Sequence, residues 1–384
     1  MKMFHISDLH IGKQLHGYSL IEDQRQILKE ILNLIKEHHP RVLLIAGDVY
    51  DKAVPSAEAV EVLDEFLTGL SRLSWLETYI ISGNHDNDRR LDFGGRILKN
   101  CHIHITSIAP DEQNPTLAKE ELEDEYGKVN IYLMPFLKPS YVKSIYPENE
   151  IETYEDAIRA VLEHADIDGD ERNVLVAHQL FSGHGEAVEE SASETFRVGG
   201  QDNIDVRVLE DKFEYAAFGH LHAPQKAGKT CYRYSGSPLK YSISEEHQKK
   251  GISVAELGEK GNVKISILPL IPKREVRSVR GTLQSICEDA KEKNCDDFIA
   301  VTLTDEEELY DAGHALKNAY PNLLFWQVDN SRTQHEIQEM EEIVTLDAPI
   351  DAFAAFYQEM QGMPLDPEEK LKISQIIEKV GDYS

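Results

Sequence analysis

Five short motifs in the first 222 residues carry side chains that could bind metal ions. They are Asp8-Leu9-His10, Gly47-Asp48-Val49-Tyr50-Asp51, Gly83-Asn84-His85-Asp86, Ala177-His178 and Gly219-His220-Leu221-His222. Seven of their residues offer carboxylate, amide or imidazole ligands, namely Asp8, His10, Asp48, Asn84, His178, His220 and His222. This mixture suits Mn²⁺, Fe²⁺ or Zn²⁺ better than Ca²⁺ or Mg²⁺. Together the motifs supply enough ligands to hold two metal ions side by side.

Two metal ions held in this way would give the motifs a defined chemistry, the hydrolysis of phosphate esters. Ions about 3.5–4 Å apart can hold two phosphate oxygens and lower the pKa of a bound water, which attacks phosphorus in line. Asp48 has two carboxylate oxygens and is the natural bridge between the ions. His85 follows Asn84 and could face the site without binding metal. It is therefore the candidate for acting on the leaving oxygen, and Asp86 could hold its tautomer.

Each motif alone is an ordinary sequence feature. Gly-Asp is usually a turn, and a histidine after an apolar strand, such as His178, is more often a core residue than a ligand. The five motifs are informative because they occur together, each at the end of an apolar run. Cysteine is absent from all of them, which argues against a thiolate zinc site.

The strands that precede the motifs must position them. We expect strands over 2–7, 41–46, 78–81, 173–177 and 215–218, each ending at a motif. After Arg41, the run 41–46 is continuously apolar, which is typical of a strand buried on both faces. Helices over 22–38 and 56–72 separate the first three strands and predict right-handed βαβ units. Because ligands bind beyond the carboxyl ends of such strands, five loops can meet in one crevice. In the first loop, Asp8 and His10 alternate along what we expect to be an extended segment and should point the same way.

Further strands make this part of the chain rich in β-structure. We expect them over 102–105, 129–134, 230–234, 252–257 and 263–268, with a helix over 153–165. The mixture predicts an α/β fold in which two sheets are flanked by helices. We place this domain at residues 1–270.

A smaller unit follows. A strand over 277–281, a helix over 283–293, a strand over 298–303, a helix over 308–319 and a strand over 323–328 predict a small α/β domain, residues 271–330. A polar stretch, 331–347, is the expected linker. Residues 348–384 predict a C-terminal helix pair, in which Asp366 caps the second helix and Pro367 takes its first position. Both helices carry an apolar stripe, over 350–360 and 371–380.

Composition limits the function classes. The chain has 384 residues with 41% hydrophobic and 28% charged residues, and it has no apolar run long enough to span a membrane. Cys101, Cys231, Cys287 and Cys295 form no CxxC pair, and we expect free thiols in a reducing cytoplasm, with a Cys287–Cys295 disulfide as the alternative. The net charge of −29 is unusual for a protein that binds DNA alone. Either the substrate is not a polynucleotide, or metals or a partner supply positive charge.

Two segments leave alternatives open. Tyr234-Ser235-Gly236-Ser237-Pro238 could be a tight turn between strands or a loop that touches substrate. The stretch 179–203 is rich in Gly, Ser and Glu and directly follows a motif histidine, so we expect a long loop that is functional or mobile.

The five motifs, in this order, resemble those of the calcineurin-like metallophosphoesterase superfamily. Within it, the chain closely resembles the SbcD family, which provides the nuclease of bacterial SbcCD complexes. The resemblance covers nearly the whole length and includes Asp8-Leu9-His10-Ile11-Gly12, His178-Gln179 and Tyr234-Ser235-Gly236-Ser237-Pro238. It implies a metallophosphoesterase sandwich, a small capping domain over 271–330 and a C-terminal helix pair.

The resemblance also assigns roles. Asp8, His10, Asp48 and His222 would form the first metal site; Asp48, Asn84, His178 and His220 would form the second. His85 would be the catalytic histidine. Related archaeal and eukaryotic nucleases have another histidine near the end of the second motif, where this chain has Asp51, which could instead support a ligand.

The implied activity is that of a manganese-dependent DNA nuclease. It would act as an exonuclease on double-stranded ends and as an endonuclease on hairpins, in DNA repair, replication and recombination. The implied partner is SbcC, an ATPase with a long coiled coil, in a complex that contains two copies of this chain. We expect the stripes at 350–360 and 371–380 to pack on each other and, in part, to grip that coiled coil.

Two other interpretations remain. A phosphatase or cyclic-nucleotide phosphodiesterase would use the same motifs, and only the regions after residue 270 favour the nuclease. A scaffold that had lost catalysis would be expected to lack ligands, whereas all seven and His85 are present.

Overall fold

The computed structural model describes residues 1–184, 188, 189, 191–194, 203–293, 296–307 and 309–331, with isolated positions 357, 366 and 372. Internal contacts divide the chain into two units. The first contains Met1–Ser278, Cys295–Ala300 and Asn322–Phe325, and the second contains the remaining residues.

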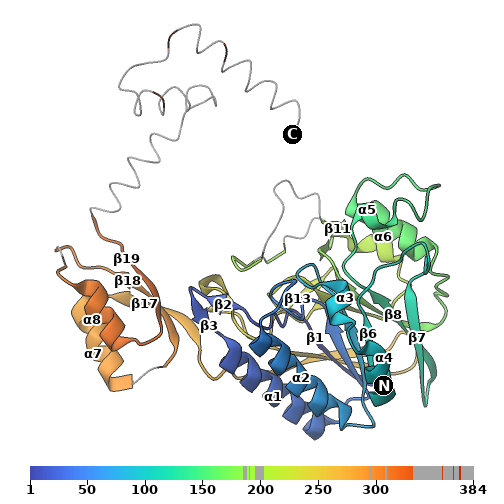
Figure 1. Cartoon of the computed structure of the whole chain (residues 1–384), viewed down its shortest axis with the longest axis horizontal. Helices are drawn as coiled ribbons and strands as arrows, with labels where there is room; N and C mark the ends of the chain where they lie inside the picture. Colours follow the sequence, from blue (N-terminus) through green and yellow to red (C-terminus); the bar gives the residue numbers. More distant parts are fainter. Residues whose placement is uncertain are drawn as a thin grey trace. The chain divides into compact units, whose positions relative to one another are not determined.

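One six-stranded sheet of the first unit carries the first three motifs. Its order is β16 (Val263–Pro269), β15 (Gly251–Leu257), β1 (Lys2–Ile6), β4 (Val42–Ala46), β5 (Glu77–Ile81) and β6 (Ile103–Thr106). Strands β1, β4, β5 and β6 are parallel, whereas β15 and β16 are antiparallel to their neighbours. Helices α1 (Ile21–His38) and α2 (Ala57–Ser71) pack on its outer face (Figure 1). The hydroxyl of Ser56 caps α2 by accepting the N–H of Ala59 at 3.2 Å.

The other six-stranded sheet carries the last two motifs. Its order is β13 (Gln225–Ala227), β14 (Lys229–Tyr234), β12 (Tyr215–Gly219), β9 (Arg172–His178), β8 (Gly127–Met134) and β7 (Ala118–Asp124). Strands β8, β9, β12 and β14 are parallel. Helices α5 (Pro139–Val142) and α6 (Tyr154–Glu163) cover the outer face, and Thr153 and Asp156 form a capping box at the start of α6.

The two sheets face each other across a buried apolar layer. Alternate residues of one strand serve different cores: Leu44 of β4 points into the layer between the sheets, whereas Leu43 and Ile45 pack under α1 and α2. Strand β9 follows the same rule, with Val176 between the sheets and Leu175 on the outer side. Burial on both faces explains the continuous apolar runs in the sequence. The predicted two-sheet α/β sandwich flanked by helices is confirmed.

The elements absent from the sequence prediction are short or polar. Strand β7 has the sequence Ala-Lys-Glu-Glu-Leu-Glu-Asp and lies at a sheet edge, where charged residues prevent pairing with another chain. The hairpin of β2 (Gln14–Leu15) and β3 (Tyr18–Ser19) and the helices α3 (Asp88–Leu91) and α4 (Gly95–Leu98) are too short to show periodicity. The remaining small elements are β10 (Phe181–Ser182), β11 (Ile204–Asp205), η1 (Lys99–Cys101), η2 (Val206–Leu209) and η3 (Ile243–Glu245).

A three-stranded sheet follows the sandwich in sequence. Its order is β17 (Val276–Gly281), β18 (Phe298–Leu303) and β19 (Leu323–Val328), and α7 (Leu283–Lys293) packs against α8 (Ala312–Ala319). Helix α8 begins four residues later than the predicted 308–319. The domain boundaries remain predictions, because the linker 331–347 and the helix pair 348–384 lie outside the described residues, apart from Ser331 and the three isolated positions.

Among the described residues, Cys101, Cys231 and Cys287 are free thiols. Cys295, and with it the alternative disulfide, lies outside them. None of the described helices is both long enough and apolar enough to cross a membrane.

Candidate metal centre

All five motifs lie where parallel strands end. Asp8, Asp48 and Asn84 follow β1, β4 and β5 of one sheet, whereas His178 ends β9 and His220 follows β12 of the other. The site is therefore built at one edge of the sandwich by both sheets. The expectation that these loops meet in one place agrees with the distances between their side chains.

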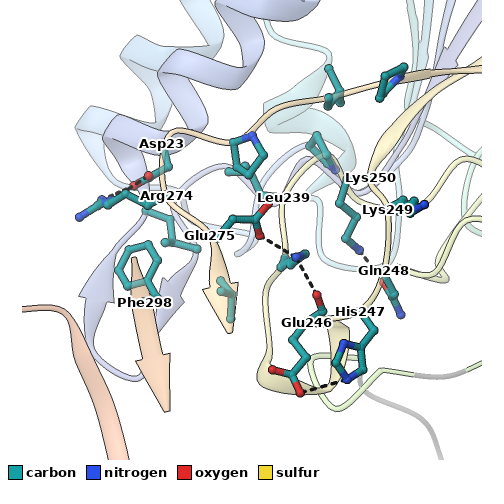
Figure 2. A pocket seen from close by; sticks show the side chains of 17 residues that line it. Asp23, Leu239, Glu246, His247, Gln248, Lys249, Lys250, Arg274, Glu275 and Phe298 are labelled. Atoms are coloured by element: carbon teal, nitrogen blue, oxygen red, sulfur yellow. Dashed lines mark hydrogen bonds and ion pairs between the residues drawn. The ribbon is translucent and has the colours of Figure 1, made fainter. Parts of the chain in front are cut away.

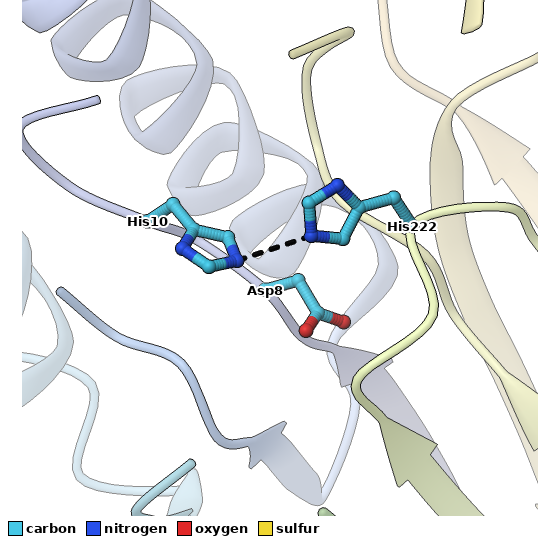
Figure 3. Close-up of side chains that lie close together, drawn as sticks. All are labelled: Asp8, His10 and His222. Carbon is cyan, nitrogen blue, oxygen red and sulfur yellow. Dashed lines mark hydrogen bonds between the residues drawn. The ribbon is translucent and has the colours of Figure 1, made fainter. Parts of the chain in front are cut away.

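The first ligand group comprises Asp8, His10 and His222. All three are buried, and their donor atoms lie within 4.8 Å of one another. The Nε2 atoms of His10 and His222 face each other at 3.1 Å, with the Asp8 carboxylate beside them (Figure 3). Asp8 is anchored from behind, because its Oδ1 accepts the N–H of His220 at 2.9 Å.

The second group comprises Asn84, His178 and His220. The Asn84 Oδ1 atom lies 3.1 Å from Nε2 of His178 and 3.0 Å from Nδ1 of His220. Asp48 stands between the two groups, since its Oδ2 is 3.5 Å from Nε2 of His10 and 3.4 Å from Nε2 of His178. This is the position that a bridging carboxylate would need.

The chemistry of the donors fits divalent cations. The ring of His178 donates its Nδ1–H to the carbonyl of Ala46 at 2.8 Å, which leaves Nε2 as the atom that faces Asp48 and Asn84. Burial alone would lower the pKa of His178, but the carboxylates of Asp48 and Asp8 raise it to about 9. Positive charge is therefore favoured between these groups, and a metal ion would replace the proton there.

Two motif glycines are required by close approach to these ligands. A Cβ atom on Gly219 would lie 1.9 Å from the carbonyl oxygen of Ala46 and 2.7 Å from Nδ1 of His178. A Cβ atom on Gly47 would lie 2.4 Å from the same nitrogen, and the φ of Gly47 is +85°. Glycine thus precedes a ligand in these motifs because the His178 ring occupies the space that a side chain would fill.

The backbone at several ligands differs from the expectation. Asp8 and His10 were expected to share a face because they alternate along an extended segment, and this reason is wrong. Their φ values are +53° and +42°, those of Asp48 and His220 are +48° and +106°, and β1 ends before them at Ile6. Left-handed turns, not an extended strand, direct Asp8 and His10 toward one point.

His85 stands beside the ligands and is held differently from the prediction. Its Nδ1–H donates to the backbone carbonyl of Asp51 at 2.9 Å, which fixes the tautomer and leaves Nε2 free. Asp86 was the predicted partner, but its carboxylate instead accepts the backbone N–H groups of Val49, Tyr50 and Gly83. The His85 ring centroid lies 4.8 Å from that of His10.

Asp51 contributes more than its backbone. Its Oδ1 lies 3.6 Å from Nδ1 of His10 and 3.1 Å from Nζ of Lys13. The residue therefore sits behind a ligand, in the supporting position that its place in the second motif suggested.

The segment 234–238 is buried and is held to neighbouring segments by hydrogen bonds. The hydroxyl of Tyr234 lies 3.0 Å from the carbonyl oxygen of Gln179 and 2.9 Å from that of Phe181, just after β9. The hydroxyl of Ser235 donates to the carbonyl of His5 at 2.7 Å. Both side chains are at most 1% exposed, so they are not available to substrate. Of the two alternatives, the turn between strands is favoured over the loop that touches substrate.

Other residues of the site could not be found from motifs. Ser193 and Glu194 lie in the long segment 179–203, and both bind His222, through its ring and its backbone N–H. Burial raises the pKa of Glu194 to about 7. The only signal for them in the sequence was the position of the loop directly after a motif.

Two family profiles match this chain. The profile of the calcineurin-like phosphoesterase family matches residues 1–224, and that described as the type 5 capsule protein repressor C-terminal domain matches 272–361. The SbcD component of the SbcCD nuclease from Staphylococcus epidermidis is 31% identical over 327 residues, 84% of each chain. Its namesake from Staphylococcus saprophyticus is 28% identical over 389 residues, 98% of each chain. A match to a solved structure, a dimetal phosphatase from Danio rerio, covers 70% of this chain and 96% of that chain, with 11% identity and a TM-score of 0.45.

Replacing Gly219 with alanine tests the close approach at His178. The added Cβ must push apart the carbonyl of Ala46 and the His178 ring, so we expect Gly219→Ala to lower the free energy of unfolding by about 1–3 kcal/mol and to weaken Mn²⁺ binding. Thermal unfolding and calorimetric Mn²⁺ titration measure both effects. Gly169→Ala is the matched control, because nothing lies within 4 Å of its Cβ position. Equal melting temperatures and affinities for the two variants would contradict the explanation.

Proposed function

The chain belongs to the calcineurin-like phosphoesterase family, and from this premise we propose that it is a metal-dependent DNA nuclease that acts with an SbcC-type ATPase. The relatives that span most or nearly all of its length are named as the SbcD component of an SbcCD nuclease. The observation that carries the proposal is Asp48 lying 3.5 and 3.4 Å from histidines of two separate ligand groups. The phosphatase or cyclic-nucleotide phosphodiesterase alternative is not favoured, since the matches to SbcD proteins extend beyond the catalytic domain.

Each predicted ligand has a defined task in this proposal. Asp8, His10, Asp48 and His222 would hold one divalent ion, and Asp48, Asn84, His178 and His220 the other. When bound, the two ions neutralise phosphate charge and activate water for attack on phosphorus. The protein's part is to fix the ligand geometry: Ala46 orients His178, and the N–H of His220 orients Asp8.

His85 would donate a proton to the leaving oxygen. Its Nδ1–H is engaged by the carbonyl of Asp51, so a proton carried on Nε2 is the one available for transfer. Its ring packs edge-on against His10, which keeps Nε2 close to the ligands without making it one of them. Manganese is the proposed metal, because the combination of carboxylate, amide and imidazole suits it.

A cavity beside Asn84 supports a polynucleotide substrate. It has a volume of about 420 Å³ and is lined in part by Phe136, Lys138 and Tyr141. The Lys138 ammonium lies 5.9 Å from the ring centroid of Phe136 and 5.8 Å from that of Tyr141. Aromatic faces next to a cation are the features that bind bases and phosphates of an unpaired strand.

Cleavage of a DNA hairpin tests the proposal and the role of His85. We expect the purified protein to cut the hairpin with Mn²⁺ and to lose this activity in EDTA. His85→Ala should retain Mn²⁺ binding but cut at least about 100-fold more slowly, because the leaving oxygen loses its proton donor. Gel assays and calorimetry measure the two properties.

His164→Ala is the control, since His164 lies at the C-terminal end of α6 and bonds to Ala160 and Glu148. A normal rate of cleavage by His85→Ala would refute the catalytic assignment. Failure of the wild-type protein to cut any DNA, with or without partner and ATP, would refute the function.

We further propose the domain organisation given by the sequence: a nuclease domain over 1–270, a capping domain over 271–330, a linker over 331–347 and a helix pair over 348–384 that binds SbcC in the cytoplasm. The partner would supply part of the DNA-binding surface that a net charge of −29 does not. Deleting 348–384 should abolish co-purification with SbcC while Mn²⁺-dependent activity on small phosphodiesters remains. Unchanged co-purification would show that another surface binds the partner.

We also propose that two copies of this chain form a homodimer, for which the first unit has a candidate surface. Val54, Val60, Phe93 and Ile97 are exposed, with 89% of Phe93 and 72% of Ile97 accessible. They surround or adjoin an apolar cavity of about 660 Å³ between α2 and the helices α3 and α4. Exposed apolar surface of this kind marks an interface in a soluble protein.

We expect the double variant Phe93→Glu/Ile97→Glu to be monomeric when the wild-type protein is dimeric, because buried carboxylates oppose association. Light scattering after size-exclusion chromatography measures the mass. Ile271→Glu, also at a position with 72% exposure, is the control. A double variant that remains dimeric would exclude this surface, and a monomeric wild type would exclude the homodimer.

A further inference from the structure

The ring of His222 is bound on both sides. Its Nε2 faces His10 at 3.1 Å, and its Nδ1 lies 2.7 Å from Oγ of Ser193. The Ser193 hydroxyl donates its single proton to Oε1 of Glu245 at 2.6 Å. Oγ must therefore accept from Nδ1, which fixes the proton on Nδ1 and leaves the Nε2 lone pair directed at the first ligand group.

Glu245 is a fixed acceptor. It is fully buried, and its Oε2 pairs with Nζ of Lys250 at 2.7 Å. The Lys250 ammonium on Oε2 and the Ser242 hydroxyl, which donates to Oε1 at 3.0 Å, both hold Glu245 as an accepting carboxylate. Because a charged carboxylate ends the hydrogen-bond chain, the Ser193 hydroxyl donates to Glu245 and accepts from Nδ1 of His222, and the opposite direction is disfavoured.

Lys250 holds the backbone of the same histidine. Its ammonium donates to the carbonyl of His222 at 2.8 Å, to Ser237 Oγ at 2.9 Å and to Gln248 Oε1 at 2.7 Å. Figure 2 shows Lys250 and Gln248 joined in this way. Glu194 accepts the backbone N–H of His222. The ring, the N–H and the C=O of His222 are thus each held by a separate polar group.

The loop that brings Ser193 to this place is itself fastened to the sandwich. The N–H of Ala192 donates to Ser244 Oγ at 2.9 Å. Within the loop, the N–H of Ser191 donates to Oε2 of Glu194 at 2.8 Å. Gln248 Nε2 lies 3.3 Å from Ser191 Oγ. The segment 191–194 is therefore docked by hydrogen bonds against the loop that carries Glu245 and Lys250.

His10 provides the contrast. Its Nδ1 has no hydrogen-bond partner among the described residues, and the nearest carboxylate, that of Asp51, is 3.6 Å away. Within the first ligand group, His222 is the imidazole whose tautomer is set by a hydrogen bond.

We propose that Ser193, Glu245 and Lys250 form a positioning relay that sets the tautomer and orientation of His222 and thereby the metal affinity of the first site. The inference rests on the metal centre of the proposed function. A cation at Nε2 draws electrons from the ring and makes Nδ1–H a stronger donor, so the acceptor chain ending on Glu245 stabilises the metal-bound state more than the free one. These residues do not touch substrate or reacting atoms.

Calorimetric titration of the full-length protein with Mn²⁺ tests the relay without any DNA. The wild-type protein should show two binding events. We expect Ser193→Ala to weaken one event by about 10- to 100-fold and leave the other unchanged. Ser193→Thr keeps the hydroxyl and should restore the affinity. In the cleavage assay, high Mn²⁺ concentration should restore the rate of Ser193→Ala to near the wild-type value.

Ser235→Ala is the control, because it removes another hydrogen-bonded serine hydroxyl, whose partner is the carbonyl of His5 and not a ligand. A general loss of packing would lower the melting temperature of both variants and change both binding events alike. Glu245→Gln supplies a second test, with the same site-selective loss expected. If that variant does not fold, the comparison of Ser193→Ala with Ser193→Thr still tests the relay.

Unchanged affinities in Ser193→Ala, or an equal loss at both events, would overturn the relay. A wild-type protein that binds two Mn²⁺ ions but cuts no DNA would refute the proposed function and leave the relay intact. A wild-type protein that binds fewer than two ions would remove the basis of both.

Discussion

One hydrogen bond between the two sheets determines the geometry of the candidate site. The Nδ1–H of His178, at the end of β9, donates to the carbonyl of Ala46, at the end of β4. It sets the separation of two strand ends whose loops carry Asp48 on one side and His220 on the other. A second link between the same two edges, from the N–H of His220 to Oδ1 of Asp8, lies beside it, so the five motifs converge on one group of ligands.

The contact requires space around the His178 ring, because the imidazole must fit between two backbone segments. Gly47 and Gly219 provide that space by having no Cβ atom. The Gly-Asp and Gly-His pairs of the motifs are therefore coupled through His178. Each glycine provides room for a ligand that a different strand contributes, while the residue after it provides a ligand of its own.

The fold and the identities of the candidate ligands could be predicted because buried parallel strands leave continuous apolar runs, and the residues after such runs lie at a known edge. Strand β7 could not be predicted, since an edge strand of Lys, Glu and Asp resembles a loop in composition. The partner of His85 was predicted wrongly, because the turn after β4 brings the Asp51 carbonyl to the ring and directs Asp86 to three backbone amides. Ser193 is 29 residues from His222, and nothing in its local sequence indicates that the chain brings the two together.

Asp8, His10 and Asp48 adopt left-handed dihedral angles that glycine would adopt without strain. Such conformations cost on the order of 1 kcal/mol per residue. Glycine at these positions would relieve the backbone strain but would supply no ligand. Ions that bind the folded chain and not the unfolded one offset that cost by mass action. The same three positions therefore face opposing demands, stability in the absence of metal ions and hydrolytic activity in their presence. A variant selected for one of these properties is expected to lose some of the other.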